Sequence, residues 1–275
     1  MKKYLIFTLI LFLLGCSDNS DNRVLHMGIK SSLENIKLFL NTNIYFGHQS
    51  VGNNIINGIK EILIENEIND FKPFELNAIS TLPKNYFVHS PIGKNGNPIS
   101  KIEDFKKDIT ILKNKNLKIA MMKFCYVDFN EKTNIDKIFD YYIKAIDSIK
   151  TKNPNLIILH LTVPLKSERS FLGKIKAYLT GKSDKTFNDN YVRNQYNDLI
   201  RSKYSSEYIF DIAKIESTYP DGKREIKTLD NKSCYYLSKI YTSDGGHLNG
   251  FGQKVVANEL INKIAKINLR MKESS

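Results

Sequence analysis

Ile44-Tyr45-Phe46-Gly47-His48-Gln49-Ser50-Val51-Gly52 joins a short apolar run to the start of a helical pattern. The apolar run predicts a buried strand, and the spacing of apolar residues after it predicts a helix over 51–66. Ser50 then lies in a strand-to-helix turn, where glycines permit tight backbone geometry and the first helix amides can stabilise a negatively charged oxygen. Such a turn is typical of an α/β sheet that carries a nucleophilic serine.

Short apolar runs alternate with longer amphipathic segments along the chain, which predicts a parallel sheet covered by helices on both faces. We expect strands at 43–47, 72–78, 117–124, 156–163 and 206–212. We expect helices at 51–66, 99–115, 134–152, 187–203 and 251–267. Two segments interrupt the alternation: 166–186, which is basic, and 218–241, where we expect a hairpin. Both follow strands, so they should lie at the carboxyl edge of the sheet, where open α/β sheets bind ligands.

A second motif, Ser243-Asp244-Gly245-Gly246-His247-Leu248-Asn249-Gly250, precedes the last predicted helix. Asp244 stands three residues before His247 in a glycine-rich loop. Its carboxylate can therefore reach the imidazole and hold the tautomer whose other nitrogen accepts a serine proton. Helix N-capping is the alternative role for Ser50. The Asp-x-x-His block at the same sheet edge favours catalysis, because capping does not require it.

Residues 42–266, with these two blocks in place, resemble the SGNH/GDSL-type hydrolases, a family of esterases and acyltransferases. The resemblance implies a three-layer α/β/α fold with a flavodoxin-like parallel sheet of about five strands. It also implies that Ser50 is the nucleophile, that His247 is the general base oriented by Asp244, and that no cofactor is needed. Thr162-Val163-Pro164-Leu165 resembles the Thr/Pro-containing turn that many members have after the fourth strand.

The chain departs from the family pattern at two places. His48-Gln49-Ser50 stands where Gly-Asp-Ser is usual, and 121–128 lacks the usual Gly-x-Asn, so the asparagine that would donate to the oxyanion is absent. The Ser50 amide is one replacement donor. The other candidate groups for the oxyanion or the substrate are Gly93, Asn95, His48, Lys123 and Tyr126. For His48, packing beside a strand is the alternative role.

The first residues predict export. A basic pair precedes the apolar run Tyr4–Leu14, which is too short to span a bilayer and has the form of a secretory signal. Leu13-Leu14-Gly15-Cys16 resembles the bacterial lipobox, which predicts a signal peptide at 1–15 and lipidation of Cys16. The alternative is an ordinary signal peptide with an incidental cysteine. A polar tether at 16–23 and one domain over 24–275 should follow.

Composition restricts the partners. The formal net charge is +12, from 41 basic and 29 acidic residues, but the lysines are dispersed. No basic stripe interleaves with aromatic residues, so the charge favours tolerance of anionic lipid or polyanionic glycan over nucleic-acid binding. Cys125 and Cys234 remain after Cys16, and their spacing does not decide whether they pair. The chain has no zinc-binding pattern, so we expect no metal.

Together these features predict a lipid-anchored serine esterase of the bacterial envelope, facing the periplasm or the cell surface. Its substrate would be a carboxylic ester. The family and the location imply an O-acyl group on a carbohydrate. Two alternatives stay open: a non-catalytic glycan-binding or envelope lipoprotein on the same fold, and an O-acyltransferase with the same triad.

Overall fold

The computed structural model describes residues 30–77, 81–170, 173, 175, 179–180 and 184–273. The predicted signal peptide at 1–15, the tether at 16–23 with Cys16, and the expected start of the domain at residue 24 lie outside the described residues. Within the described ranges, no helix combines the length and the apolar character that a membrane crossing requires.

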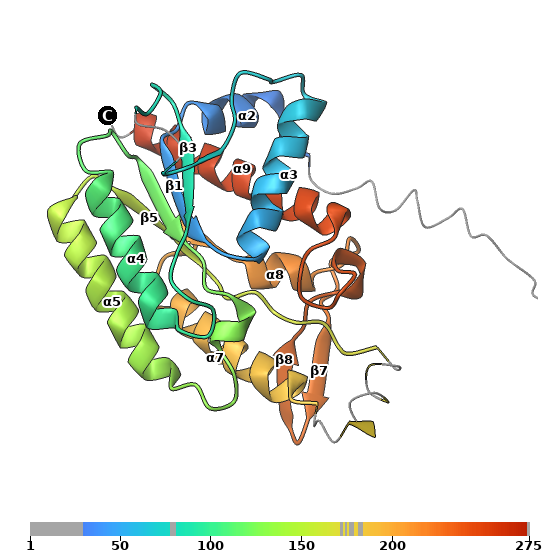
Figure 1. Cartoon of the computed structure of the whole chain (residues 1–275). Coiled ribbons are helices and arrows are strands. Elements are labelled where there is room, and N and C mark those ends of the chain that lie inside the picture. The colour runs from blue at the N-terminus through green and yellow to red at the C-terminus, as the bar shows by residue number, and fades with distance from the viewer. Residues whose placement is uncertain are drawn as a thin grey trace, which may run out of the picture.

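A parallel sheet runs through the middle of the molecule (Figure 1), with the strand order β2-β3-β1-β4-β5-β6. The strands are β1 (Ile44–His48), β2 (Phe74–Glu75), β3 (Phe87–Pro91), β4 (Ile119–Met122), β5 (Ile157–Leu161) and β6 (Ile209–Phe210). In β1, Ile44 lies opposite Phe87 on one side and Ile119 on the other. Because β1 is an inner strand, the turn that follows it emerges at the middle of the carboxyl edge.

The expected fold class is confirmed. When the two-residue edge strand β2 is set aside, the other strands have the order 2-1-3-4-5 in chain numbering, which is the flavodoxin-like order. Helices cover both faces of this sheet, which gives the three-layer α/β/α arrangement.

The prediction is wrong at the second strand. The strand beside β1 is β3 at Phe87–Pro91, where the sequence predicts a loop, whereas the predicted strand at 72–78 contributes only Phe74–Glu75 at the sheet edge. The reason is physical: β3 is short, carries the polar side chains of His89 and Ser90 in buried positions, and ends at a proline. It therefore lacks the apolar run that indicates a buried strand.

The last predicted strand is also shorter than expected. Residues Ser206–Tyr208 form a 3-10 turn, β6 has two residues, and a short helix starts at Ile212. The segment 218–241 does contain a hairpin, formed by the antiparallel pair β7 (Ile226–Leu229) and β8 (Lys232–Tyr235).

The helices form two layers with separate hydrophobic cores. One layer consists of α2 (Leu33–Leu40), α3 (Val51–Glu65), α8 (Ile212–Ser217) and α9 (Gly250–Glu273). The opposite layer consists of α4 (Pro98–Ile111), α5 (Ile135–Lys152) and α7 (Thr186–Lys203). The sequence does not predict α2, and α9 continues beyond the predicted end at 267.

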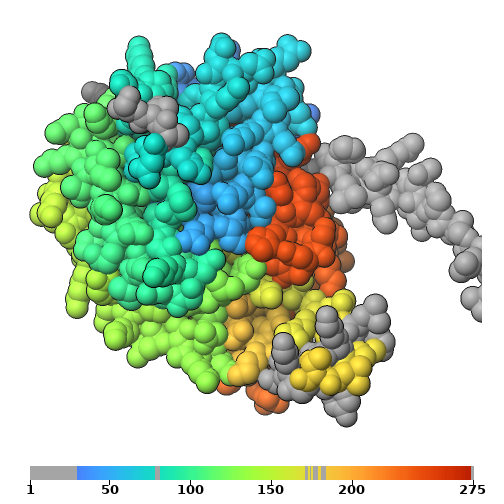
Figure 2. All heavy atoms as spheres, in the orientation of Figure 1, coloured from blue at the N-terminus to red at the C-terminus, as the bar shows by residue number. Residues whose placement is uncertain are grey.

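Close packing of α3 on α9 sets the place of the turn after β1 relative to the C-terminal segment. Gly58 makes this approach possible, because a Cβ atom there would lie 2.2 Å from the backbone oxygen of Gln253. The blue segment and the red C-terminal segment border each other on the surface in Figure 2. The loop that carries Asp244 and His247 leads directly into α9, so this packing holds it near the end of β1.

Candidate active site

The turn between β1 and α3 holds Ser50 in a strained conformation. Its φ is 53° and its ψ is −112°, whereas an ordinary N-cap residue lies in the extended region. Its side chain accepts no hydrogen bond from a helix amide. A non-glycine residue with positive φ at a strand-to-helix turn is the geometry that exposes a nucleophile in α/β hydrolytic enzymes.

Two neighbours of Ser50 fix the turn. The Gln49 side-chain amide donates to the backbone oxygen of Ile92 over 2.8 Å and also contacts the Gly93 oxygen, which ties the turn to the loop after β3. Gly52 lets α3 begin directly against the His48 ring, since a Cβ at Gly52 would lie 2.4 Å from that ring. The turn is therefore held from both sides.

Ser50 and His247 meet at the carboxyl edge of the sheet. Ser50 Oγ lies 2.7 Å from His247 Nε2, and His247 Nδ1 lies 2.6 Å from Asp244 Oδ2. Because the carboxylate accepts the proton on Nδ1, Nε2 is the nitrogen that is free to accept the serine proton. The side chains of His247 and Asp244 are 45 % and 57 % exposed, so water reaches the pair.

The glycine-rich loop is shaped around Asp244. Gly245 has a φ of 85°, which favours glycine. The Asp244 carboxylate accepts the N–H groups of Gly246 and His247 at 2.8 and 2.7 Å, in addition to the imidazole. Partial burial acts to raise the pKa of Asp244, but these hydrogen bonds outweigh it and hold the pKa below its ordinary value. The carboxylate therefore stays ionised when the histidine needs it.

Asn54 is a site residue that the sequence analysis missed. Its side-chain oxygen accepts the backbone N–H of Leu248 at 3.1 Å, which ties α3 to the loop of His247. Its position four residues after Ser50 is the available signal, because residues four apart share one face of a helix. Gln49 was missed as an anchor for a different reason: its partners in the loop after β3 are remote in sequence.

One of the expected donor groups is engaged elsewhere, and the side-chain oxygen of another expected residue is bound by a lysine. The Gly93 N–H donates to Asp104 at 2.7 Å, and the Asn95 side-chain oxygen accepts from Lys101 at 3.0 Å. Lys101 also forms a fully buried ion pair with Asp128 at 2.6 Å. The loop after β3 is therefore held in place beside the site by Asp104 and by the Lys101–Asp128 ion pair.

His48 and Lys123 lie beneath the turn, away from solvent. His48 is 2 % exposed and its Nε2 lies 3.1 Å from His89 Nδ1. Burial lowers the pKa of His48 to about 2, so the ring is neutral. Lys123 is fully buried and donates to the Phe124 oxygen at 3.0 Å and to Cys125 Sγ at 3.4 Å. Neither side chain is directed at Ser50 by any of these contacts. Cys125 and Cys234 are both free thiols.

Tyr126, at the start of the 3-10 turn Tyr126–Asp128 after β4, contacts the loop of His247. Its ring packs edge-on against His247 with the centroids 6.0 Å apart. A Cβ atom at Gly246 would lie 2.9 Å from the Tyr126 hydroxyl, so only glycine permits this contact. Of the five donor candidates, Tyr126 is the one whose side chain contacts His247.

Two cavities bear on the location of the site. One, of about 530 Å³, begins at Asp244 and Gly245 and continues to Lys166 and Arg169 in the loop after β5. The larger, of about 730 Å³, lies between β6, α8 and α9 and contains no residue of the Ser-His-Asp group. Among the described residues, no three or more His, Cys, Asp or Glu side chains gather where they could hold a metal ion.

No family model and no curated protein matches the chain. Several solved structures are similar to it in fold. A carbohydrate esterase of family 3 from Talaromyces cellulolyticus shares 14 % identity over 83 % of this chain and 99 % of that one, with a TM-score of 0.44. The periplasmic domain of a lipopolysaccharide acetyltransferase from Salmonella serovar Paratyphi A shares 16 % identity over 89 % and 94 %, with a TM-score of 0.45.

A protein assigned to the G-D-S-L lipolytic family from Desulfitobacterium hafniense shares 11 % identity over 81 % of this chain and 99 % of that one, with a TM-score of 0.42. The fold is the one that the resemblance to SGNH/GDSL-type hydrolases implies. The strand order given above identifies this fold.

Proposed function

We propose that this chain is a serine esterase that hydrolyses carboxylic esters, with Ser50 as the nucleophile. The observation that carries the proposal is the series of contacts from Ser50 Oγ to His247 Nε2 and from His247 Nδ1 to Asp244. Helix capping does not account for Ser50, because its side chain accepts no helix amide and its φ is positive.

The geometry supports a two-step reaction. Ser50 Oγ attacks the ester carbonyl while His247 Nε2 accepts the hydroxyl proton, and the same proton then passes to the leaving alkoxide. Water next attacks the acyl-enzyme, gives its proton to His247, and releases the acid while Ser50 regains a proton. Asp244 keeps His247 in the required tautomer and stabilises its cationic form.

The oxyanion formed in each step needs hydrogen-bond donors. We assign the Ser50 N–H as the first donor, because it begins α3 and donates to no acceptor among the described residues. We assign the Tyr126 hydroxyl as the second donor. It lies against the catalytic loop, and it has no hydrogen-bond partner in the described ranges. Gly93 is a poorer donor, because its N–H already donates to Asp104, and Lys123 is a poorer donor because it is fully buried and donates to Phe124 and Cys125.

The exposure of His247 and Asp244 favours hydrolysis over acyl transfer. An acyltransferase must keep water away from its acyl-enzyme, whereas these two side chains are about half exposed. We further propose that the enzyme is anchored at the bacterial envelope through Cys16 and acts on acylated carbohydrate. These two assignments rest on the lipobox-like sequence and on the family resemblance.

The test is turnover of 4-nitrophenyl acetate by the purified full chain. Ser50→Ala and His247→Ala should each lower kcat by roughly a thousandfold or more, and Asp244→Asn by somewhat less. The Ser50→Ala/His247→Ala double variant should resemble either single one, because the base has no role without the nucleophile. Ser205→Ala is the matched control and should keep wild-type activity, because Ser205 precedes the amino end of β6, whereas the site lies at the carboxyl edge of the sheet.

Three results would overturn this proposal. Wild-type turnover in Ser50→Ala would assign the chemistry to another residue. No turnover by the wild type across several acyl esters would favour the non-catalytic binding lipoprotein. Product formed only when a carbohydrate alcohol is added, without hydrolysis, would favour the acyltransferase.

A further inference from the structure

Lys166 occupies a fixed place at the edge of the candidate site. Its backbone N–H donates to the Asn190 side chain at 3.0 Å, and its backbone oxygen accepts from the same side chain at 2.8 Å and from the Leu237 N–H at 3.2 Å. Asn190 is fully buried. The main chain at Lys166 is therefore held on both sides, and its side chain starts from a defined position.

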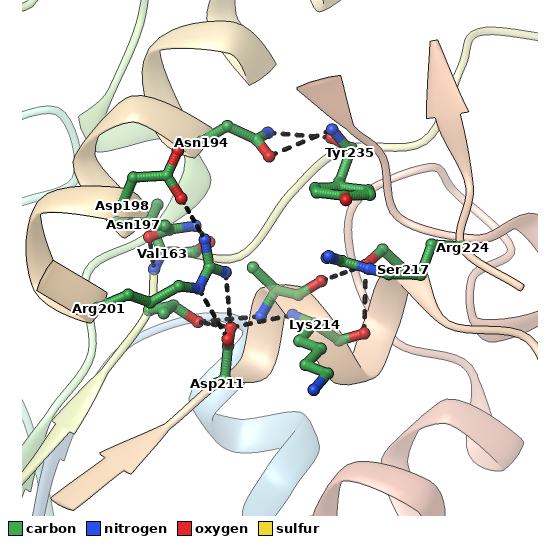
Figure 3. A network of polar contacts seen from close by, with 12 residues as sticks. Val163, Asn194, Asn197, Asp198, Arg201, Asp211, Lys214, Ser217, Arg224 and Tyr235 are labelled. Carbon is green, nitrogen blue, oxygen red and sulfur yellow. Dashed lines mark hydrogen bonds and ion pairs between the residues drawn. The ribbon is translucent and has the colours of Figure 1, made fainter. Parts of the chain in front are cut away.

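The loop that leads to Lys166 is anchored by a polar network (Figure 3). Asn197 exchanges two hydrogen bonds with the backbone of Val163, at 2.7 and 2.9 Å. Arg201 pairs with Asp211 through two hydrogen bonds of 2.8 Å. This rigid support makes the loop after β5 suitable for positioning a recognition group.

The Lys166 ammonium lies beside the catalytic residues and forms no direct ion pair among the described residues. Nζ is 5.4 Å from the centre of the Tyr126 ring, and that ring contacts His247. In the described part of the chain, Nζ has neither a hydrogen-bond partner nor an ion-pair partner. Among the described residues, the other two basic ones that line the 530 Å³ cavity are paired, Arg169 with Asp184 at 3.5 Å and Lys239 with Glu168 at 3.6 Å.

The surroundings of Lys166 include a second cation, Arg193, which pairs with Asp189 at 3.8 Å. Arg193 is 2 % exposed, donates to the Tyr126 backbone oxygen at 2.8 Å, and places its guanidinium 5.9 Å from the Tyr126 ring centre. Partial burial lowers the pKa of Lys166, and Arg193 and Arg169 act in the same direction, whereas the carboxylates of Asp244 and Asp189 oppose them with smaller effects. A partly desolvated ammonium without a direct ion-pair partner is stabilised when an anion approaches it.

We propose that Lys166 binds an anionic group of the substrate, so that the preferred ester is an acylated acidic saccharide whose carboxylate or phosphate enters the cavity beside Asp244. This proposal rests on the proposed function and narrows its substrate class. Tyr126 would lie between the anionic group and the reacting ester, because it contacts both Lys166 and His247.

The experiment compares kcat/KM for three O-acetylated probes: methyl glucuronoside, glucose 6-phosphate and neutral methyl glucoside. The wild type should prefer at least one acidic probe to the neutral one. Lys166→Met should lower that ratio by roughly ten- to a hundredfold, the range expected for a hydrogen bond to a charged group. Lys166→Arg should restore most of it. The two acidic probes distinguish a carboxylate from a phosphate as the recognised group.

Lys232→Met is the matched control. Lys232 also lies over a tyrosine, with Nζ 5.3 Å from the Tyr191 ring centre, but it belongs to the β7–β8 hairpin and lines no part of the cavity. It should leave the acidic-to-neutral ratio unchanged. An equal ratio in the wild type and in Lys166→Met would overturn the proposal while leaving the esterase intact.

A second measurement separates this proposal from the esterase itself. Binding of glucuronate disaccharide and of its neutral analogue to the Ser50→Ala protein can be followed by calorimetry, without turnover. Tighter binding of the acidic sugar that is lost in Ser50→Ala/Lys166→Met supports the anion site even if the chain hydrolyses nothing. Equal binding of both sugars would contradict it.

Discussion

Ser50 Oγ lies 2.7 Å from His247 Nε2, across 197 positions of sequence. The contact exists because β1 is an inner strand of the sheet and because α9, which follows the loop of His247, packs on α3. Each partner is also held by its own segment: Gln49 fixes the serine turn, and Asn54 fixes the histidine loop. The distance between Ser50 and His247 therefore depends on the position of β1 in the sheet and on the packing of α9 against α3.

Gly246→Ala should lower esterase turnover by about tenfold or more. A Cβ at this position would lie 2.9 Å from the Tyr126 hydroxyl, so either the tyrosine or the loop of His247 must move, and small displacements of catalytic groups are costly. Gly250→Ala is the control, because no atom lies within 4 Å of the Cβ it adds. Steady-state kinetics on 4-nitrophenyl acetate measures both. Equal kcat in the two variants would show that the Tyr126 contact does not position the loop.

Gly58→Ala should destabilise the protein by roughly 1–3 kcal/mol. Alanine normally stabilises a helix interior by about 1 kcal/mol relative to glycine. Here the added Cβ would lie 2.2 Å from the backbone oxygen of Gln253, so α3 and α9 must separate. Urea unfolding of Gly58→Ala, compared with Asn57→Ala at the neighbouring exposed position, measures the effect. A stabilised Gly58→Ala protein would mean that the two helices do not pack this closely.

Much of the fold was predictable because its signals are local. The run Ile44–Phe46, the glycines around Ser50 and the helical spacing after it define a strand, a turn and a helix within one short segment. The strand β3 could not be found in this way, since its place next to β1 depends on pairing with a segment 43 residues distant in sequence, Ile44 opposite Phe87. The helix α2 was also missed, and it is fixed by its packing on α9.

In the candidate site, too, the features with local sequence signals were predictable and those that depend on tertiary contacts were not. Ser50, Asp244 and His247 could be proposed from residue type and spacing, because each lies in a short glycine-containing motif with residue types that can form a Ser-His-Asp group. The positive φ of Ser50 and the clamp on Lys166 through Asn190 depend on tertiary contacts. The burial of Lys123 does too, and residue type alone could not distinguish this buried lysine from the half-buried Lys166.

Glu216→Gln should change how stability depends on pH. Glu216 is fully buried, and burial raises its pKa to about 8, against the opposing effect of the Leu165 N–H that donates to its carboxyl group. The folded protein thus keeps a proton that the unfolded chain releases near pH 4.5, so the free energy of unfolding should fall as the pH rises from about 4.5 to about 8.

The glutamine variant has no such proton to lose, so its free energy of unfolding should fall less over this window. Between pH 5 and pH 8, the free energy of unfolding of the wild type should fall by at least about 1.4 kcal/mol more than that of the variant, which is the free energy of one pKa unit. Urea unfolding at both pH values gives the comparison, and other ionisable groups cancel because they are shared. Parallel curves for the two proteins would argue against a protonated Glu216.

Cys16→Ala should abolish lipid attachment. The segment Leu13-Leu14-Gly15-Cys16 predicts that Cys16 becomes the modified N-terminal residue after the signal peptide is removed. Expression in a bacterium fed with labelled palmitate should give a labelled, membrane-bound wild type and an unlabelled variant. Ser17→Ala, which leaves the cysteine in place, should behave as the wild type. Persistent labelling of Cys16→Ala would refute lipidation at this residue.

The most direct test of the account is reaction of the purified full chain with a fluorophosphonate probe, followed by peptide mass spectrometry. An activated serine displaces fluoride and keeps the phosphonyl group, whereas an ordinary serine reacts poorly. We predict one adduct, at Ser50, that forms in the wild type and is lost in Ser50→Ala and strongly reduced in His247→Ala. An unlabelled wild-type protein, or labelling at another serine that persists in Ser50→Ala, would contradict the assignment of Ser50 as the nucleophile.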